Sequence, residues 1–449
     1  MPTTAGVPSP TRRERWAWYL YDFGNSAYAS VVLLAVYAAY FQGKVVGGAQ
    51  GSLLWGLAVG IAMLVVAISA PILGTLADFS GSKKRFLLFY TVMACLFTAL
   101  LFFTQPGTVF TGMLFFILAE IGYRSAQVFY DALLPEIAGP KEIGRVSGTG
   151  WAIGSAGGIV ILLLVLPPLL LTQKTWVDPF GTAWMARVAL LVTAIFFALC
   201  SIPLFLWLRE RAQPQPLPAG ESFVSVAFKR LWRTFRAARH FREFIKFFVA
   251  FLVYNDGIII TLDFAAILGA VFYGMNQQQL LIFFIVVQAT NVVGAYVFGW
   301  LADRLSYKRS LLLAILILIG TVIWLYFTTT LTGYFFVGAV AGFAMAGAQA
   351  VSRSMVGAIS PAGQSAEFFG FFATAGRTSS FIGPAIFGWM VALANNWYTA
   401  QGLAQDAANQ AGHRLALFTI VAFLVVGLLL LLLVNERQAR TAASAGARS

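Results

Sequence analysis

The chain has 449 residues, of which 59% are hydrophobic and only 10% charged, and it carries a formal net charge of +13. Soluble domains carry about 25% charged residues, so this composition excludes an ordinary water-soluble core and indicates a membrane protein. A basic excess would suit nucleic-acid binding in a soluble protein. Here the basic residues follow the membrane topology, and we expect no nucleic-acid partner.

Long apolar runs recur along the whole chain, and each is long enough to cross a bilayer core about 30 Å thick as a helix. The first six runs cover residues 16–41, 52–77, 86–103, 108–134, 146–171 and 183–208, and the second six cover 244–272, 279–302, 310–327, 334–359, 368–394 and 414–434. None shows the ten-residue alternation of barrel strands. We therefore expect an all-α integral membrane protein with twelve transmembrane helices in two six-helix halves.

The expected domains are an N-terminal bundle (1–208), a basic linker (209–243), a C-terminal bundle (244–434) and a tail (435–449). Basic residues gather before the first run, after the second, fourth and eighth runs, in the linker and in the tail. The positive-inside rule then predicts a multi-pass protein of the cell inner membrane with both termini cytoplasmic. The linker is expected to contain a surface helix, either as a tether that sets topology or with a regulatory or lipid-binding role.

Residues for enzymatic or cofactor chemistry are sparse. Both cysteines, Cys95 and Cys200, lie inside apolar runs, and the two histidines, His240 and His413, are far apart in sequence. No nucleophile elbow, zinc-protease motif or P-loop occurs. We expect no enzyme activity, no cofactor and no metal.

An internal repeat relates the two halves. Gly74-Thr-Leu-Ala-Asp78 closes the second run, and Gly299-Trp-Leu-Ala-Asp303 closes the eighth, 225 residues later; the same offset carries Gly158 onto Gly383. Parallel six-helix repeats of this kind place a solute site at their interface near the bilayer midplane. The repeat therefore predicts a secondary transporter that works by alternating access.

The sequence also resembles known families. The pattern from Gly74 through Asp78 and Gly81 to Arg85 resembles the loop signature of the major facilitator superfamily. Four stretches, at residues 18–27, 128–137, 254–257 and 349–354, resemble the vacuole-effluxer permeases, a family that includes a fungal autophagy-related vacuolar amino-acid exporter and bacterial relatives. The resemblance implies the major facilitator fold and, more weakly, amino-acid export. The fungal members are larger, so a vacuolar location does not carry over.

Polar residues inside the apolar runs are the candidates for substrate binding and coupling, because each is costly in lipid unless paired or hydrated. Asp22 with Asn25 and Asp256 with Asn255 lie in the first helix of each half, where a carboxylate could bind an ammonium group, carry a proton or serve as a fixed structural pair. The full candidate set is Asp22, Asn25, Arg124, Gln127, Asp131, Asn255, Asp256, Asp263, Gln349, Arg353 and Arg377.

The charged members of this set have competing interpretations. Arg124 lies four residues after Glu120, so the two share a helix face and can form a self-contained pair. By resemblance to related facilitators, Arg124 would serve in proton coupling or in the gate. Arg353 and Arg377 have no acid nearby in sequence, and their partners must come from other helices or from a substrate carboxylate.

A second candidate set lies at the cytoplasmic helix ends and consists of Asp78, Lys84, Arg85, Asp303 and Arg309. Its occurrence in both halves favours a gate that locks the cytoplasmic side; the alternative is a weak surface salt bridge. We expect a monomeric secondary active transporter that moves a small polar solute and uses protons as the coupling ion, with amino-acid efflux as the leading candidate. The alternatives are another substrate class, such as a sugar, peptide or drug, or a transporter-derived solute sensor.

Overall fold

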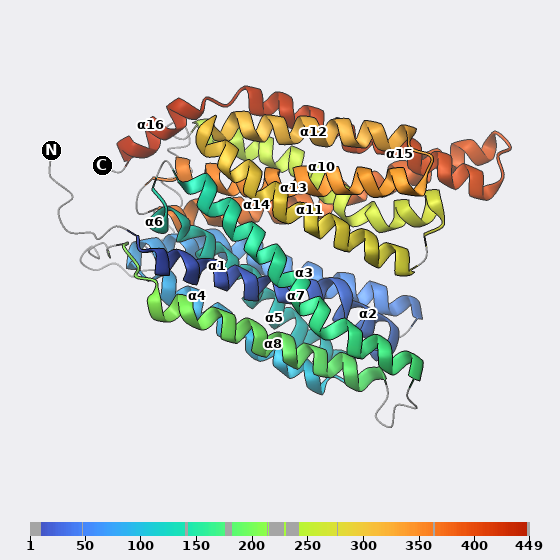
Figure 1. Ribbon diagram of the computed structural model, residues 1–449, viewed down its shortest axis with the longest axis horizontal. Helices are drawn as coiled ribbons and strands as arrows, with labels where there is room; N and C mark the ends of the chain where they lie inside the picture. The colour runs from blue at the N-terminus through green and yellow to red at the C-terminus, as the bar shows by residue number, and fades with distance from the viewer. Residues whose placement is uncertain are drawn as a thin grey trace. The chain divides into compact units, whose positions relative to one another are not determined.

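The structure is a computed structural model, and it describes residues 10–46, 48–139, 142–175, 182–212, 214, 229, 242–275, 277–361 and 364–446. Throughout this part of the chain the secondary structure is helical, which confirms the all-α fold (Figure 1). Ten of its helices are long and apolar enough to cross a membrane. The expected surface helix of the linker lies outside the described residues.

The contacts divide the chain into two compact units. Unit 1 consists of residues 1–140, 153–233 and 363–371, and unit 2 of residues 141–152, 234–362 and 372–449. The units follow the two sequence halves except at two short segments, each of which includes the start of a long helix.

The helices of unit 1 run in chain order as follows: α1 (Arg12–Tyr28), η1 (Ala29–Ala35), α2 (Tyr37–Tyr40), η2 (Phe41–Val46), α3 (Gly48–Ser80), α4 (Lys83–Leu100), η3 (Leu101–Phe103), α5 (Val109–Ala132), α6 (Leu134–Ile137) and α8 (Thr182–Trp207). Helix α7 (Ile143–Thr175) begins in unit 2 and continues in unit 1. The expected first run is thus interrupted, because η1 and η2 are π-helical.

Unit 2 contains α10 (Arg242–Tyr273), α11 (Gln277–Arg304), α12 (Tyr307–Phe327), α13 (Leu331–Ile359), most of α14 (Ser365–Ala400), α15 (Gln405–Leu432) and α16 (Glu436–Gly446). Helix α15 begins nine residues before the expected run at 414, and α16 lies in the segment expected to be only a tail.

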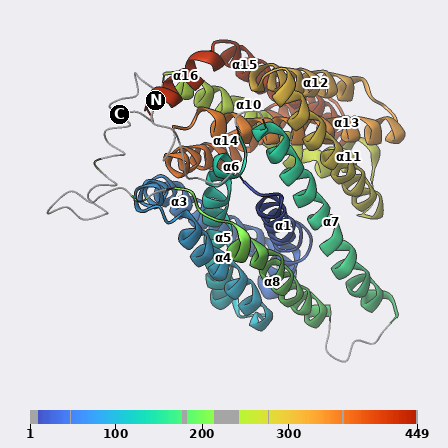
Figure 2. The same cartoon turned by 60° about the vertical axis from the view of Figure 1, so that its left-hand side comes forward.

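Equivalent helices pack in equivalent ways in the two units. In unit 1, α1 packs on α8, α5 packs on α3 and α4, and α4 packs on α8; in unit 2, α10 packs on α15, α13 packs on α11 and α12, and α12 packs on α15. Figure 2 shows α4 beside α5, and α12 beside α13. The sequence repeat is therefore a structural repeat.

The sequence marks where several helices begin and end. The Thr11 hydroxyl and the Glu14 carboxylate cap the start of α1 reciprocally, and Ser306 caps α12 by accepting the Arg309 N–H at 3.1 Å. Gly81 has φ of +60° between α3 and α4, a conformation that favours glycine. These caps satisfy backbone groups that a helix end leaves unpaired.

The distribution of side chains on helix α4 indicates whether lipid or water surrounds the helices. Its buried side includes Thr91, Ala94 and Thr98, whereas Phe89 and Val92 are 63% and 54% exposed. A helix in water would bury the large apolar side chains instead. Small residues at helix contacts and large apolar ones outside are typical of membrane bundles.

Candidate functional site

An amide pair links two helices of unit 1. The side chain of Asn25 on α1 donates to Oε1 of Gln127 on α5 at 3.2 Å. Asp22, one turn before Asn25, is 5% exposed. A Cβ at Gly154 of α7 would lie 2.8 Å from Cγ of Asp22, so this glycine allows the carboxylate to approach α7.

A second amide pair occupies the equivalent place in unit 2. The side chain of Gln349 on α13 donates to Oδ1 of Asn255 on α10 at 2.8 Å. The neighbouring Asp256 is also 5% exposed, and its Oδ1 accepts the backbone N–H of Gly383 on α14 at 2.8 Å. The sequence predicted these residues individually, and the structure brings them together as two matching clusters.

The charged residues of α5 form a short row in which Glu120 and Asp131 are buried and Arg124 is partly exposed. Nε of Arg124 lies 2.6 Å from Oε1 of Glu120, whose side chain is fully buried, and the guanidinium stacks over the ring of Tyr123. The intrahelical pair expected from their spacing is therefore present. Asp131, 9% exposed, follows Gln127 by one turn.

Arg353 contacts the start of α7 within unit 2. Its Nε donates to the Ser147 hydroxyl at 2.9 Å, one terminal nitrogen donates to the Ser147 carbonyl at 2.6 Å, and its guanidinium lies over the ring of Trp151. Asp263 is exposed on α10. Arg377 falls within α14, but its side chain lies outside the described residues.

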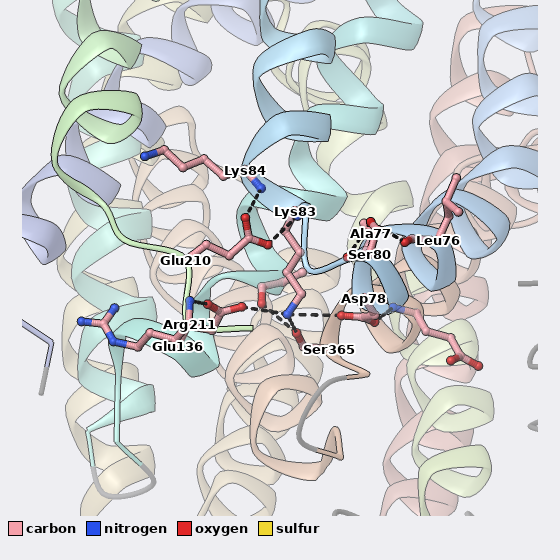
Figure 3. A network of polar contacts seen from close by, with 12 residues as sticks. Leu76, Ala77, Asp78, Ser80, Lys83, Lys84, Glu136, Glu210, Arg211 and Ser365 are labelled. Carbon is pink, nitrogen blue, oxygen red and sulfur yellow. Dashed lines mark hydrogen bonds and ion pairs between the residues drawn. The ribbon is translucent and has the colours of Figure 1, made fainter. Parts of the chain in front are cut away.

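Asp78 belongs to a buried ion network in unit 1. Nζ of Lys83 lies 3.2 Å from Asp78, 2.8 Å from Glu136 and 2.7 Å from the Ser365 hydroxyl, while Asp78 accepts the backbone N–H of Glu367 at 2.8 Å. Figure 3 shows the Lys83 side chain pointing between the three oxygen-bearing side chains. Lys83 is only 1% exposed, so this is not the weak surface salt bridge considered as the alternative.

Asp303 makes the repeat-related contact in unit 2. Its two carboxylate oxygens accept the backbone N–H groups of Gly144 and Arg145 at 2.8 and 2.6 Å, at the start of α7. Asp78 binds the start of α14 in the same manner. Negative charge at a helix N-terminus is stabilising, because the first N–H groups point outward and the helix dipole is positive there.

The basic residues predicted beside these aspartates have other contacts. Nζ of Lys84 donates to the Leu208 carbonyl at 2.7 Å, and Arg85 and Arg309 are exposed. The cation that binds Asp78 is Lys83, which was not in the set predicted from sequence. Burial was the missing information, because three adjacent basic residues look alike in sequence.

A set of glutamates at helix ends was not among the residues predicted from sequence. Glu210, after α8, accepts the Lys83 and Lys84 N–H groups at 2.5 and 3.2 Å, and Glu436, after α15, accepts the Lys308 N–H at 3.0 Å. Their spacing of 226 residues, close to the repeat offset, was the available signal. Burial raises the pKa of Glu210 to about 7 despite these N–H donors.

Glu14 joins the network from the start of α1. It accepts the Arg209 N–H at 3.1 Å and pairs with the Arg211 guanidinium at 3.0 Å. Burial alone would raise its pKa, but the hydrogen bonds from Arg211, Thr11 and Arg209 outweigh it and lower the pKa to about 2. The end of α8 is thus tied to the starts of α1 and α4.

Comparisons with known proteins agree with this geometry. Residues 54–444 match the family model described as "Vacuole effluxer Atg22 like". The chain is 28% identical over 430 residues, 95% of each chain, to a protein of Bacillus subtilis named an uncharacterized MFS-type transporter, YxiO. It is 26% identical over 268 residues to autophagy-related protein 22-2 of Aspergillus clavatus, covering 54% of this chain and 43% of the fungal one.

Solved transporters share the fold at low sequence identity. The proton:xylose symporter XylE matches 97% of this chain and 98% of its own with a TM-score of 0.71 and 13% identity. FucP in its outward conformation matches 92% and 97% with a TM-score of 0.66 and 13% identity. Together with the family match over most of the sequence, these findings show that the chain belongs to the vacuole effluxer Atg22-like family of membrane-spanning major facilitator transporters.

Proposed function

We propose that this transporter moves a small polar solute, with amino acids as the first class to test, by proton-coupled alternating access in the efflux direction. The supporting observation is the matched pair of polar clusters, Asn25 with Gln127 and Asn255 with Gln349, each beside a buried aspartate. Carboxylates inside transmembrane helices are costly, and they characteristically mark substrate or ion pathways.

The roles within the clusters follow from their chemistry. Amide groups donate and accept, so they suit a zwitterion's carboxylate and ammonium groups equally. Asp22 and Asp256 are proposed to bind the ammonium group or the coupling proton, and the arginines to bind the carboxylate. The proposed set further includes Asp131, Asp263 and Arg377.

We further propose that Asp78 and Asp303 are gate elements on the cytoplasmic side. Each accepts a backbone N–H at the N-terminus of a long helix: Asp78 at the start of α14, and Asp303 at the start of α7. Such a hydrogen bond to a helix N-terminus can be broken and remade without chemical change. The proposal keeps the cytoplasmic termini, the inner-membrane location, the division at 209–243 and the monomeric state expected from sequence.

The test is counterflow by purified protein in liposomes preloaded with mixed amino acids and an internal pH dye. Asp256→Asn is the informative variant, because asparagine retains an oxygen to accept the Gly383 N–H while losing the charge. Asp406→Asn, which changes an exposed aspartate of α15, is the matched control. We expect saturable exchange with proton movement in the wild type and control, and at least about a tenfold loss in Asp256→Asn.

Two results would separate the parts of the proposal. Exchange without any pH change would remove proton coupling but keep the amino-acid substrate. No flux of any amino acid in either direction would remove the substrate class, and the same assay would then be run with sugars, peptides and drugs.

A further inference from the structure

A pocket of about 760 Å³ opens within unit 2 where α12 begins and α15 ends. Its lining includes four basic side chains, from Lys308, Arg309, Arg437 and Arg440, and one carboxylate, from Glu436. The proposed solute-binding residues do not line it. A pocket with this excess of positive charge is suited to an anion.

The one acid in the pocket is already engaged. Glu436 accepts the backbone N–H of Lys308 at 3.0 Å and lies 3.9 Å from Arg440. The Lys308 ammonium is held at the end of α15, donating to the Leu432 and Val434 carbonyls at 2.7 and 2.8 Å. The guanidinium groups of Arg309 and Arg437 are exposed, and neither forms an ion pair with another side chain of the described chain.

The repeat shows that this availability is particular to unit 2. In unit 1 the equivalent of Arg437 is Arg211, which pairs with Glu14 and is 13% exposed. In unit 2 the equivalent of Glu14 is Glu243, which accepts the Asn435 N–H and pairs with Lys246 instead. Unit 2 thus keeps the hydrogen bond from a backbone N–H to the glutamate, but its Arg437 is not paired with that glutamate.

The position of the pocket along the transmembrane helices indicates which kind of anion it binds. The apolar spans Tyr307–Phe327 and Gln405–Leu432 both reach their limits at this pocket, which is where headgroups meet the hydrocarbon. Leu305, Leu432 and Leu433 also line it and are 51%, 50% and 64% exposed. In such a pocket, exposed leucines can contact the acyl chains of a lipid while the neighbouring guanidinium groups contact its phosphate.

We propose that this pocket binds the phosphate headgroup of an anionic phospholipid, with Arg309 and Arg437 contacting the phosphate and the leucines contacting the first methylenes of the acyl chains. The guanidinium fork suits phosphate oxygens bidentately. Basic pockets between transmembrane helices are a recognised way to hold anionic headgroups.

The test measures lipid binding to the full-length protein in a non-ionic detergent by native mass spectrometry. Phosphatidylglycerol and phosphatidylcholine with identical acyl chains are titrated into wild type, the Arg309→Gln, Arg437→Gln double variant, its Arg309→Lys, Arg437→Lys counterpart, and a control. The control is Arg12→Gln, Arg85→Gln, which removes two exposed arginines outside the pocket. Inorganic phosphate and glycerol 3-phosphate are added as competitors.

We expect phosphatidylglycerol to bind at least about tenfold more tightly than phosphatidylcholine to the wild type and the control, and the double glutamine variant to lose this preference, whereas the lysine variant retains part of it. Equal binding of the two lipids by the wild type, or an unchanged preference in the glutamine variant, would overturn the proposal. Displacement of phosphatidylglycerol by millimolar phosphate or glycerol 3-phosphate would overturn the lipid assignment in favour of a soluble phosphate ligand.

Discussion

Lys83 and Asp78 form an ion pair of 3.2 Å in which both side chains are almost completely buried. Glu136 completes the arrangement at 2.8 Å from the same ammonium group. One ammonium group therefore lies between a fully buried carboxylate and one that is 10% exposed, and the charge of Lys83 is central to the network.

Replacing Lys83 by methionine should destabilise the protein by about 3 to 5 kcal/mol, because two buried carboxylates lose their counter-ion. The matched control is Lys246→Met, which breaks the pair of Lys246 with Glu243 at a site where the lysine is 45% exposed and should cost less than about 1 kcal/mol. Unfolding in mixed micelles, followed by tryptophan fluorescence, compares the two. Equal losses in both variants would contradict the burial argument.

The Glu210 carboxyl should make stability depend on pH. Its pKa in the folded protein is about 7, above the ordinary value of 4.5, with burial as the main cause, and Lys83, Lys84 and Glu136 are the charged groups that face it. Folding therefore favours the protonated form, so this contribution is complete below pH 4.5 and is lost as the pH rises through 7. Glu210→Gln should remove this part of the slope in unfolding measurements between pH 4.5 and 7.5. An identical slope in the variant would show that Glu210 does not titrate there.

Asp303 should hold the first turn of α7. Asp303→Ala removes both acceptors for the Gly144 and Arg145 N–H groups and should cost about 1 to 2 kcal/mol, whereas Asp303→Asn retains one acceptor and should cost less. Hydrogen exchange at residues 143–147 gives the local readout, with faster exchange expected in the order wild type, asparagine, alanine. Unchanged protection in the alanine variant would contradict the capping role.

Gly157 of α7 and Gly388 of α14 should respond oppositely to replacement by alanine. A Cβ at Gly157 would lie 2.1 Å from the Phe23 carbonyl oxygen, so Gly157→Ala forces α1 and α7 apart and should cost about 1 to 3 kcal/mol. A Cβ at Gly388 meets no atom within 4 Å among the described residues, so Gly388→Ala should stabilise α14 by up to about 1 kcal/mol. The apparent midpoints of thermal unfolding test both signs.

The helical fold was predictable because apolar runs of bilayer length have few alternatives in lipid. The repeat also predicted that Asn25 and Asn255 lie in equivalent helices of the two halves, but it could not predict their Gln127 and Gln349 partners, since those contacts depend on how helices rotate against one another. Hydropathy placed the start of the last run at 414, whereas α15 begins at Gln405, because polar residues outside the hydrocarbon can still continue a helix.

The buried network was harder to predict than the fold. A run of three basic residues gives no indication that Lys83 is enclosed while Arg85 is exposed. Glu14, Glu136 and Glu210 lie far apart in sequence and look like ordinary loop acids. Only the packing of α4 against the ends of its neighbours shows that they meet.

The reciprocal helix-start contacts bear on the ancestry of the chain. Asp78 of the first repeat caps a helix of the second, and Asp303 of the second caps a helix of the first. Reciprocal contacts of this kind, in which residue i of one copy contacts residue j of the other and j contacts i, are typical of a twofold homodimer. A six-helix protein with this motif would therefore need a second copy of itself to complete those helix starts, and this chain carries both copies in one polypeptide.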